Sequence, residues 1–274
     1  MLKLLFSAMI FAGSIFPAFG EVEYEIHTGY PTGISCFGEV GGPVVVELRT
    51  YHAAPGKLEA LFARFRERLL NPLKSQGIKD LGYWVPVDNK DDLLICILAY
   101  RDANPKTAAV TEADGDLVEK MEQVFVTPTD FSEGFAKIIP CNSNAKNPDD
   151  EAKASPPEVE HLFEMRTYTA TEGHLPNLHA RFRDHTCALF KKHGITNLAY
   201  FQITPDQPGA ENTLLYFIAH KDMDSATKSW DSFRADPEWI SAKMASEKEA
   251  GGSLTVDDGV KSVFLEPTDF SPVK

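Results

Sequence analysis

The stretch that decides the fold is VELRTY at residues 46–51, which returns as FEMRTY at residues 163–168. The same offset of 117 residues carries RFR at 64–66 onto RFR at 181–183. Motifs that recur in the same order at one spacing indicate an internal repeat. The chain is therefore predicted to contain two copies of one folding unit.

A third motif marks where the two copies end, because PTDFS occupies residues 128–132 and again 267–271. Between the copies runs a segment rich in Pro, Asn, Asp, Glu and Ser without a hydrophobic period, as is typical of linkers. The predicted organisation is an N-terminal extension at 21–43, repeat 1 at 44–139, a linker at 140–160 and repeat 2 at 161–274.

Each copy has the same sequence of strand and helix patterns. Alternating β-branched and aromatic residues predict strands, and apolar residues at helical spacing after Gly56 and Gly173 predict a helix. The expected strands lie at 44–51, 79–87, 93–101 and 121–126, and at 161–168, 197–204, 213–221 and 260–265. The order β-α-β-β-α-β is that of the ferredoxin-like unit, so the predicted fold class is α+β.

The two copies differ in length just before their closing strands. Repeat 2 has a helical stretch at about 225–248 that restarts at Asp236-Pro237, where Asp can cap a helix and Pro suits its first turn. Repeat 1 keeps only a short stretch at 111–120 in this place. We therefore expect repeat 1 to lack most of its second helix, and repeat 2 to be complete and to supply any pocket.

The first twenty residues have the pattern of a secretory signal. Lys3 is followed by an apolar run at 4–16 and by small residues at Ala18 and Gly20. This pattern predicts cleavage after Gly20 and export to the periplasm or the extracellular space. The alternative is a membrane anchor, but the apolar run is shorter than the roughly 20 residues that span a bilayer.

Four cysteines become informative if the chain is exported. Cys36 and Cys141 lie among turn residues on either side of repeat 1, so an oxidising compartment permits a disulfide between them. Sequence alone does not fix the pairing. Cys96 and Cys187 lie in apolar patterns and are expected to be buried as small hydrophobic residues.

Charge narrows the classes of partner. With 27 basic and 40 acidic residues the net charge is −13. An acidic chain is not expected to bind nucleic acid, because phosphate neutralisation needs a basic surface. Stable membrane insertion is not expected after signal cleavage.

Several separated motifs together resemble the NIPSNAP family. They are ExRTY with PGKL at 47–58, RFRDHT at 181–186, WxxFRxDPEW at 230–239 and PTDFS at 267–271. The resemblance implies the dimeric α/β-barrel superfamily, in which two ferredoxin-like units pair their sheets; here both units would be fused in one chain. The family has no securely defined reaction. Its animal members are known as mitochondrial proteins with signalling partners, which do not transfer to an exported chain.

The repeated ExRxY strands supply the first candidate constellation. Period-two alternation places three polar side chains on one face of each strand, namely Glu47, Arg49 and Tyr51, and Glu164, Arg166 and Tyr168. One interpretation is a structural Glu–Arg network lining the barrel, because buried charges persist only when paired. The other is that Arg166 holds a carboxylate and Tyr168 donates a hydrogen bond or a proton.

The first helix of repeat 2 supplies the second constellation. Leu175, Leu178, His179, Phe182, Thr186 and Leu189 share one helical stripe facing the core. His179 and Thr186 stand where repeat 1 has Phe62 and Leu69, so buried polar groups replace apolar ones. Either they satisfy each other or the backbone, or they line a ligand pocket. His185 at the edge of the stripe and Arg181 outside it are expected at the rim of such a pocket.

The candidate ligand-binding residues are therefore Arg166, Tyr168, His179, Arg181, His185, Thr186, Tyr200 and Trp230, with no catalytic residue assigned. Nucleotide-binding, nucleophile-elbow and zinc-protease motifs are absent from the sequence, and His179, His185 and His193 do not have a standard metal spacing. No cofactor and no metal are expected. The predicted function is binding of a small molecule in repeat 2. The alternatives are a cofactor-independent monooxygenase or isomerase, by analogy with the superfamily, and a protein-interaction scaffold.

Overall fold

A computed structural model describes residues 45–69, 78–100, 115–132 and 161–274, all within the compact unit Pro31–Lys274. The predicted signal at 1–20, the extension at 21–43, the linker at 140–160 and the Cys36–Cys141 pair lie outside the described residues.

The described part of repeat 1 contains four strands, one α-helix and a π-helical turn. Its elements are β1 (Val45–Ala53), α1 (Leu58–Arg64), the π-helical turn η1 (Phe65–Leu69), β2 (Ile78–Pro86), β3 (Leu93–Tyr100) and β4 (Val118–Pro128). Strand β3 is buried along its whole length, as expected for an uninterrupted apolar run. Asn89 holds the turn before it, because its side chain both accepts from the backbone N–H of Leu93 and donates to the Leu93 carbonyl.

Repeat 2 has the same order with more helix. Its elements are β5 (Leu162–Ala170), α5 (Leu175–Arg181), the π-helical turn η3 (Phe182–Thr186), α6 (Cys187–Lys192), β6 (Thr196–Ile203), β7 (Thr213–His220), α7 (Met223–Arg234), α8 (Pro237–Ala250) and β8 (Thr255–Pro267). The predicted restart is present, since Asp236 caps α8 by accepting from the N–H of Glu238, and Pro237 begins the helix.

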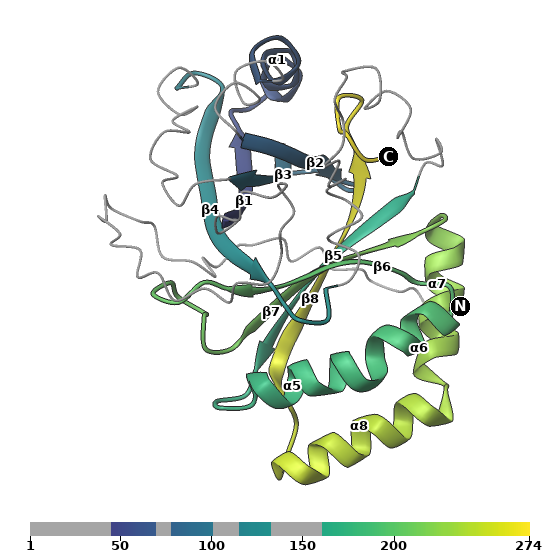
Figure 1. The fold of residues 1–274 in the computed structure, drawn as a ribbon. Coiled ribbons are helices and arrows are strands. Elements are labelled where there is room, and N and C mark those ends of the chain that lie inside the picture. Colours follow the sequence, from purple (N-terminus) through teal and green to yellow (C-terminus); the bar gives the residue numbers. More distant parts are fainter. Residues whose placement is uncertain (1–44, 70–77, 101–114, 133–160) are drawn as a thin grey trace, which may run out of the picture. The chain divides into compact units, whose positions relative to one another are not determined.

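The eight strands close into one antiparallel barrel in the order β1-β3-β2-β8-β5-β7-β6-β4, with β4 returning to β1 (Figure 1). Each repeat contributes four adjacent strands, and β2–β8 and β4–β6 join the repeats. Helix α1 packs on the strands of repeat 1, while α5 and α6 pack on those of repeat 2. The predicted α+β barrel is confirmed.

One predicted element is different. Residues 118–120, expected as part of a short helical remnant, belong to β4 and pair with the end of β1, with Lys120 opposite His52 and Val118 opposite Ala53. Pairing with a neighbouring strand outweighs the weak local helical pattern there. Residues 101–114, where the rest of the remnant was placed, lie outside the described residues.

The repeated PTDFS motif forms reciprocal arms between the repeats. Asp130 of repeat 1 accepts two hydrogen bonds from Arg183 of repeat 2, at 2.7 and 2.9 Å. Asp269 of repeat 2 accepts two from Arg66 of repeat 1, both at 2.8 Å. Phe131 inserts into the core of repeat 2, and Phe270 packs against the core of repeat 1. Each repeat therefore completes the other.

The barrel interior is filled by aromatic side chains of both repeats. Trp84 of β2 contacts Phe163 of β5 and Phe217 of β7, each with ring centroids 5.5 Å apart. The indole of Trp84 lies where a Cβ at Gly82 would be, so the glycine is required by this close approach. The interior is therefore a packed core, and polar side chains that could form a site lie on the outer, helix-facing side of the strands.

Candidate functional site

Glu164 is the centre of a buried polar cluster between the strands of repeat 2 and helix α7. Its Oε1 accepts from Arg166 Nη1 and from the Ser262 hydroxyl, both at 2.5 Å. Its Oε2 contacts His220 Nε2 at 2.9 Å and accepts from Trp230 Nε1 at 2.8 Å. Burial favours the protonated carboxyl, but the contacts with His220, Arg166 and Ser262 outweigh it and lower the pKa of Glu164 to about 2. Glu164 is therefore an anion throughout the neutral range.

Arg166 connects this cluster to the aromatic side chains around it. Its Nε donates to the Tyr216 hydroxyl at 2.9 Å and its Nη2 to the Tyr168 hydroxyl at 3.4 Å. The guanidinium also lies over the Trp230 ring, 4.4 Å from the centroid. All these partners face the helices. The Glu–Arg network therefore lies between sheet and helices, and the expectation that it lines the barrel interior is wrong. The alternation of residues along a strand predicts which side chains share a face. It does not predict whether that face points into the barrel or towards the helices.

The corresponding cluster of repeat 1 is closed. Arg49 Nε donates to Glu47 Oε1 at 2.6 Å, and its other nitrogens donate to the hydroxyls of Tyr51 and Tyr100. Tyr100 in turn donates to Glu47 Oε2. Cys96 stands opposite Arg49 where repeat 2 has Tyr216 opposite Arg166. These five side chains are all at most 4% exposed, so repeat 1 offers no access to its cluster.

The cluster of repeat 2 reaches solvent along β8. Val260 and Ser262 stand opposite Tyr168 and Arg166 in the β5–β8 ladder and share their face. Val260 is 41% exposed, Ser262 is exposed and Tyr168 is half-buried. A polar cluster that is sealed in one repeat is thus open at its edge in the other.

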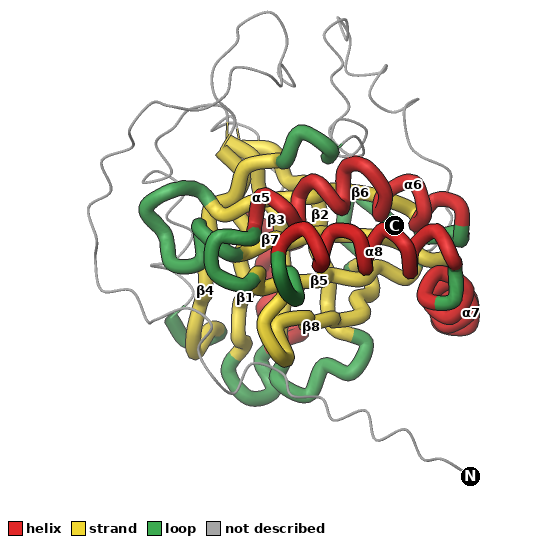
Figure 2. The backbone as a smooth tube through the Cα atoms, turned by 90° about the horizontal axis from the view of Figure 1, so that it is seen from below, coloured by secondary structure: helices red, strands yellow, loops and turns green. Residues whose placement is uncertain are grey.

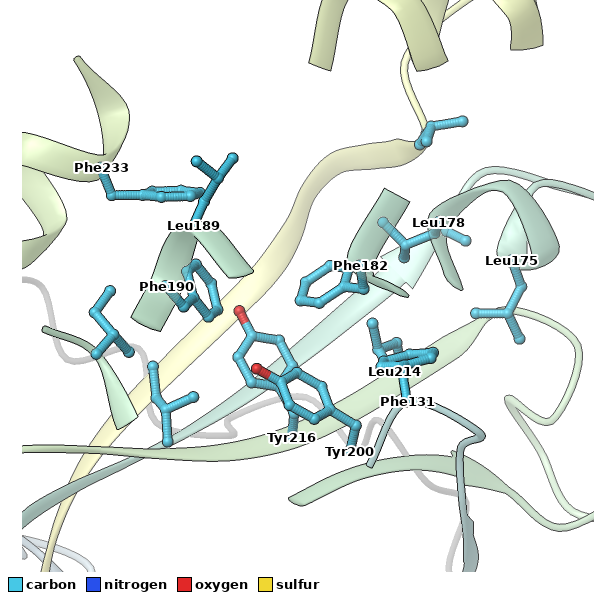
Figure 3. Packing of buried hydrophobic residues seen from close by; sticks show 14 of the residues in the cluster. Phe131, Leu175, Leu178, Phe182, Leu189, Phe190, Tyr200, Leu214, Tyr216 and Phe233 are labelled. Atoms are coloured by element: carbon cyan, nitrogen blue, oxygen red, sulfur yellow. The ribbon is translucent and has the colours of Figure 1, made fainter. Parts of the chain in front are cut away.

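Aromatic packing fills the space beneath α5, η3 and α6 (Figure 3). The rings of Tyr200 and Tyr216 stack with centroids 5.1 Å apart, and Phe182 and Phe131 pack against them. Tyr200 is buried, and its hydroxyl donates to Asn197 Oδ1 at 2.5 Å. Tyr200 and the buried Trp230, both predicted as ligand-binding residues, therefore have well-defined packing partners in the core.

The π-helical turn η3 places several predicted site residues. Thr186 is buried and its hydroxyl donates at 3.1 Å to the carbonyl of Arg181, five residues earlier. Because the π turn is wider than an α turn, it rotates His185 away from the core stripe. His185, expected at a pocket rim, is exposed. The turn recurs at the equivalent place in repeat 1, so it belongs to the folding unit.

Arg181 was expected outside the core stripe and is instead 6% exposed, because α8 covers that flank of α5 and η3 (Figure 2). Its Nη1 lies 3.7 Å from Glu247 Oε1, and its guanidinium lies 5.4 Å from the centre of the Trp239 ring. Within the described residues, Nε and Nη1 are buried without a hydrogen-bond partner. Burial lowers the pKa of Arg181.

His179 is half-buried on the same helix. Its ring meets Phe131 edge-on, with centroids 5.6 Å apart. Its Nε2 is buried and has no hydrogen-bond partner in the described part of the chain. Burial lowers the pKa of His179, so the ring is neutral at neutral pH. The Thr186 hydroxyl is therefore hydrogen-bonded to the backbone, which is one of the two predicted alternatives. His179 Nε2 makes no such bond within the described residues.

Sequence reasoning missed His220, Ser262 and Glu247 as members of this region. His220 and Tyr100 were detectable, because the hairpin shifts the repeat offset to 120 residues and brings the two into register. Glu247 has no comparable signal, since it belongs to a helix without a described counterpart. Among the described residues, no three His, Cys, Asp or Glu side chains come together as metal ligands. None of the helices described here is both long and apolar enough to cross a membrane.

The model of the NIPSNAP family matches residues 163–272. The resemblance is thereby confirmed for repeat 2, which carries a NIPSNAP domain. No curated protein matches the chain.

Solved structures match the chain at low sequence identity. An anthrone oxidase-like protein is 10% identical, with 85% of this chain and 98% of that chain covered and a TM-score of 0.50. A NIPSNAP family protein with unknown function from Agrobacterium tumefaciens is 21% identical over 43% of this chain and 96% of its own, with a TM-score of 0.36. A NIPSNAP-like domain protein from Burkholderia xenovorans is 19% identical over 42% and 91%, with a TM-score of 0.35.

Proposed function

We propose that this chain, whose second repeat carries a NIPSNAP domain, binds a small organic molecule on the helix-facing side of β5 and β8. The observation that supports this is the difference between equivalent clusters. Arg49 and its partners are sealed in repeat 1, whereas Arg166 and Tyr168 lie beside the exposed Val260 and Ser262 in repeat 2. A cluster that is exposed at its edge in one repeat and sealed in the other is expected where a ligand makes the contacts that the protein itself lacks.

The chemistry of this face suits a ligand with both apolar and polar parts. Val260 and the Tyr168 ring provide apolar surface, while the Ser262 and Tyr168 hydroxyls provide hydrogen-bonding groups. Arg166 is already paired with Glu164, so it orients Tyr168 more than it offers a free charge. Few polar groups converging beside apolar ones is the usual composition of a small-molecule site.

A fragment screen followed by amide chemical-shift mapping tests the proposal. Binding fragments should shift amides of β5 and β8 around Tyr168 and Val260. The variant Val260→Trp should abolish binding by occupying the site, and Val87→Trp is the matched control because Val87 is similarly exposed, at 43%, in repeat 1. Fragments that bind elsewhere, or equally well to Val260→Trp, would contradict it.

A cofactor-independent monooxygenase or isomerase is the second candidate. It is favoured by the pair Glu164–His220, because a carboxylate holding an imidazole is the arrangement of a general base, and His220 Nδ1 is without a partner in the described residues. His220 is only 1% exposed, so substrate would reach it only after α7 or β8 moved. Turnover of a bound ligand by wild type, lost in His220→Gln with binding intact, would establish this activity.

Export is proposed as the setting of this function. The support is the residue pattern at 1–20 described above. Intact-mass measurement on protein from its native host should give a chain that begins at Glu21. A chain beginning at Met1 would overturn the proposal without affecting the ligand site.

A further inference from the structure

Arg181 differs from the other buried arginines of the described chain. Arg49 and Arg166 each donate to a glutamate and to tyrosine hydroxyls. Arg181 is buried to a similar degree, yet two of its nitrogens donate to no described residue. Its contact with Glu247, at 3.7 Å, is an ion pair longer than a hydrogen bond. A buried guanidinium without hydrogen-bond partners destabilises the fold. A role in binding a ligand would explain why an arginine stands at this position.

The helix that covers Arg181 buries few of its own side chains. Of the fourteen residues of α8 only Ala242 is buried, and the main contacts of the helix are with α5, η3 and α7. Trp239 is half-buried and stacks on Phe233, with centroids 4.6 Å apart, at the first turn of α8. Ala250, the last residue of α8, also packs against the core of repeat 2, so opening the guanidinium of Arg181 to a ligand requires a movement of α8 as a whole.

The groups around Arg181 define what it would accept. Glu247 Oε1 lies 3.7 Å from Nη1, and the guanidinium lies over the Trp239 ring. A carboxylate accepts charge-assisted hydrogen bonds from a guanidinium, and either of the two donors without a described partner, Nε or Nη1, would be available to it. The neighbouring aromatic rings would pack on an aromatic or apolar body attached to that carboxylate.

We propose that Arg181 is the anion-binding residue of the repeat 2 site and that the ligand is an aromatic carboxylic acid whose carboxylate lies between η3 and α8. This inference rests on the proposed function, since it names the ligand class of the same site. Tyr168 links the two regions, because its ring packs against Phe182 of η3 and its hydroxyl accepts from Arg166. The acid group would thus lie beneath α8 and the body over β5 and β8.

Matched pairs of aromatic carboxylic acids and their neutral amides provide the test. Calorimetry on wild type should show acids binding at least about tenfold more tightly than the corresponding amides, the scale of one charge-assisted hydrogen bond. Arg181→Met should remove this preference and Arg181→Lys should keep part of it. The control is Arg64→Met, the equivalent position in repeat 1, which should keep the full preference.

Stability without ligand gives an independent readout. Because Arg181 lacks hydrogen-bond partners, Arg181→Met should unfold at the same urea concentration as wild type or a higher one. A marked decrease would mean that Arg181 is structural and would overturn the inference. Equal affinity for acids and amides would also overturn it while leaving the proposed function standing, whereas absence of any binding at β5 and β8 would end both.

Discussion

Tyr100 and His220 occupy the same place in the two repeats, and each contacts Oε2 of the glutamate on its first strand. Tyr100 pairs with Val45 and His220 with Leu162 in equivalent strand registers. The two clusters therefore share their geometry but differ in chemistry. Tyr100 donates its one hydroxyl hydrogen to the glutamate, whereas His220 has a second ring nitrogen, Nδ1, without a partner in the described residues.

The pH dependence of folding should report Glu164. Its pKa is about 2 in the folded chain against an ordinary value of 4.5, so the ionised form stabilises the fold above about pH 4.5 and this contribution is lost as the pH falls towards 2. Glu164→Gln should lower the free energy of unfolding by about 3–5 kcal/mol at pH 7. Urea unfolding from pH 7 to 2 should show the difference from wild type shrinking, while the exposed control Glu266→Gln changes little. A difference that is constant with pH would contradict the assignment.

Removing the His220 imidazole should cause the acid-induced loss of stability to occur at a higher pH. His220→Ala deletes one of the four contacts of Glu164, so we expect the pKa of Glu164 to rise and the free energy of unfolding to fall by about 1–3 kcal/mol. The check is the pH midpoint of acid unfolding, which should move up. His220→Gln, which keeps a donor, should recover part of the loss. An unchanged midpoint in His220→Ala would mean that Arg166, Trp230 and Ser262 suffice.

The phenylalanines of the two PTDFS segments should contribute more to the free energy of unfolding than their ion pairs do. Phe131 is 8% exposed within the core of repeat 2, so Phe131→Ala should cost about 3–5 kcal/mol of unfolding free energy. The Arg183 and Asp130 side chains are 44% and 63% exposed, so a double-mutant cycle on that pair should give only about 0.2–1 kcal/mol. A larger coupling energy than the loss from Phe131→Ala would reverse this ranking.

Gly82 and Trp84 should be coupled inside the barrel. Gly82→Ala places a methyl group where the indole lies and should destabilise the fold by about 1–3 kcal/mol. Trp84→Leu alone removes contacts with Phe163 and Phe217. In the double variant the smaller leucine leaves room for the methyl group, so the total loss should be less than the sum of the two. Additive losses in urea unfolding would show that the indole is not responsible for the glycine.

The sequence was sufficient for the strands and for the polar faces of β1 and β5, because period two and an internal repeat are global signals. It was insufficient for Arg181 and His185. His185 lies in a π turn, which contains the same residue types as an α turn, so periodicity alone placed it at a rim. The burial of Arg181 depends on how α8 packs, which is a tertiary effect.

The position of Phe270 has a consequence for how the chain reaches this structure. Phe270 packs against Phe62, Phe65 and Tyr83, so the core of repeat 1 includes a side chain about two hundred positions further along. During synthesis, repeat 1 cannot finish its core until residues 267–271 have left the ribosome. Folding should therefore be completed after translation, with unusually distant contacts slowing it.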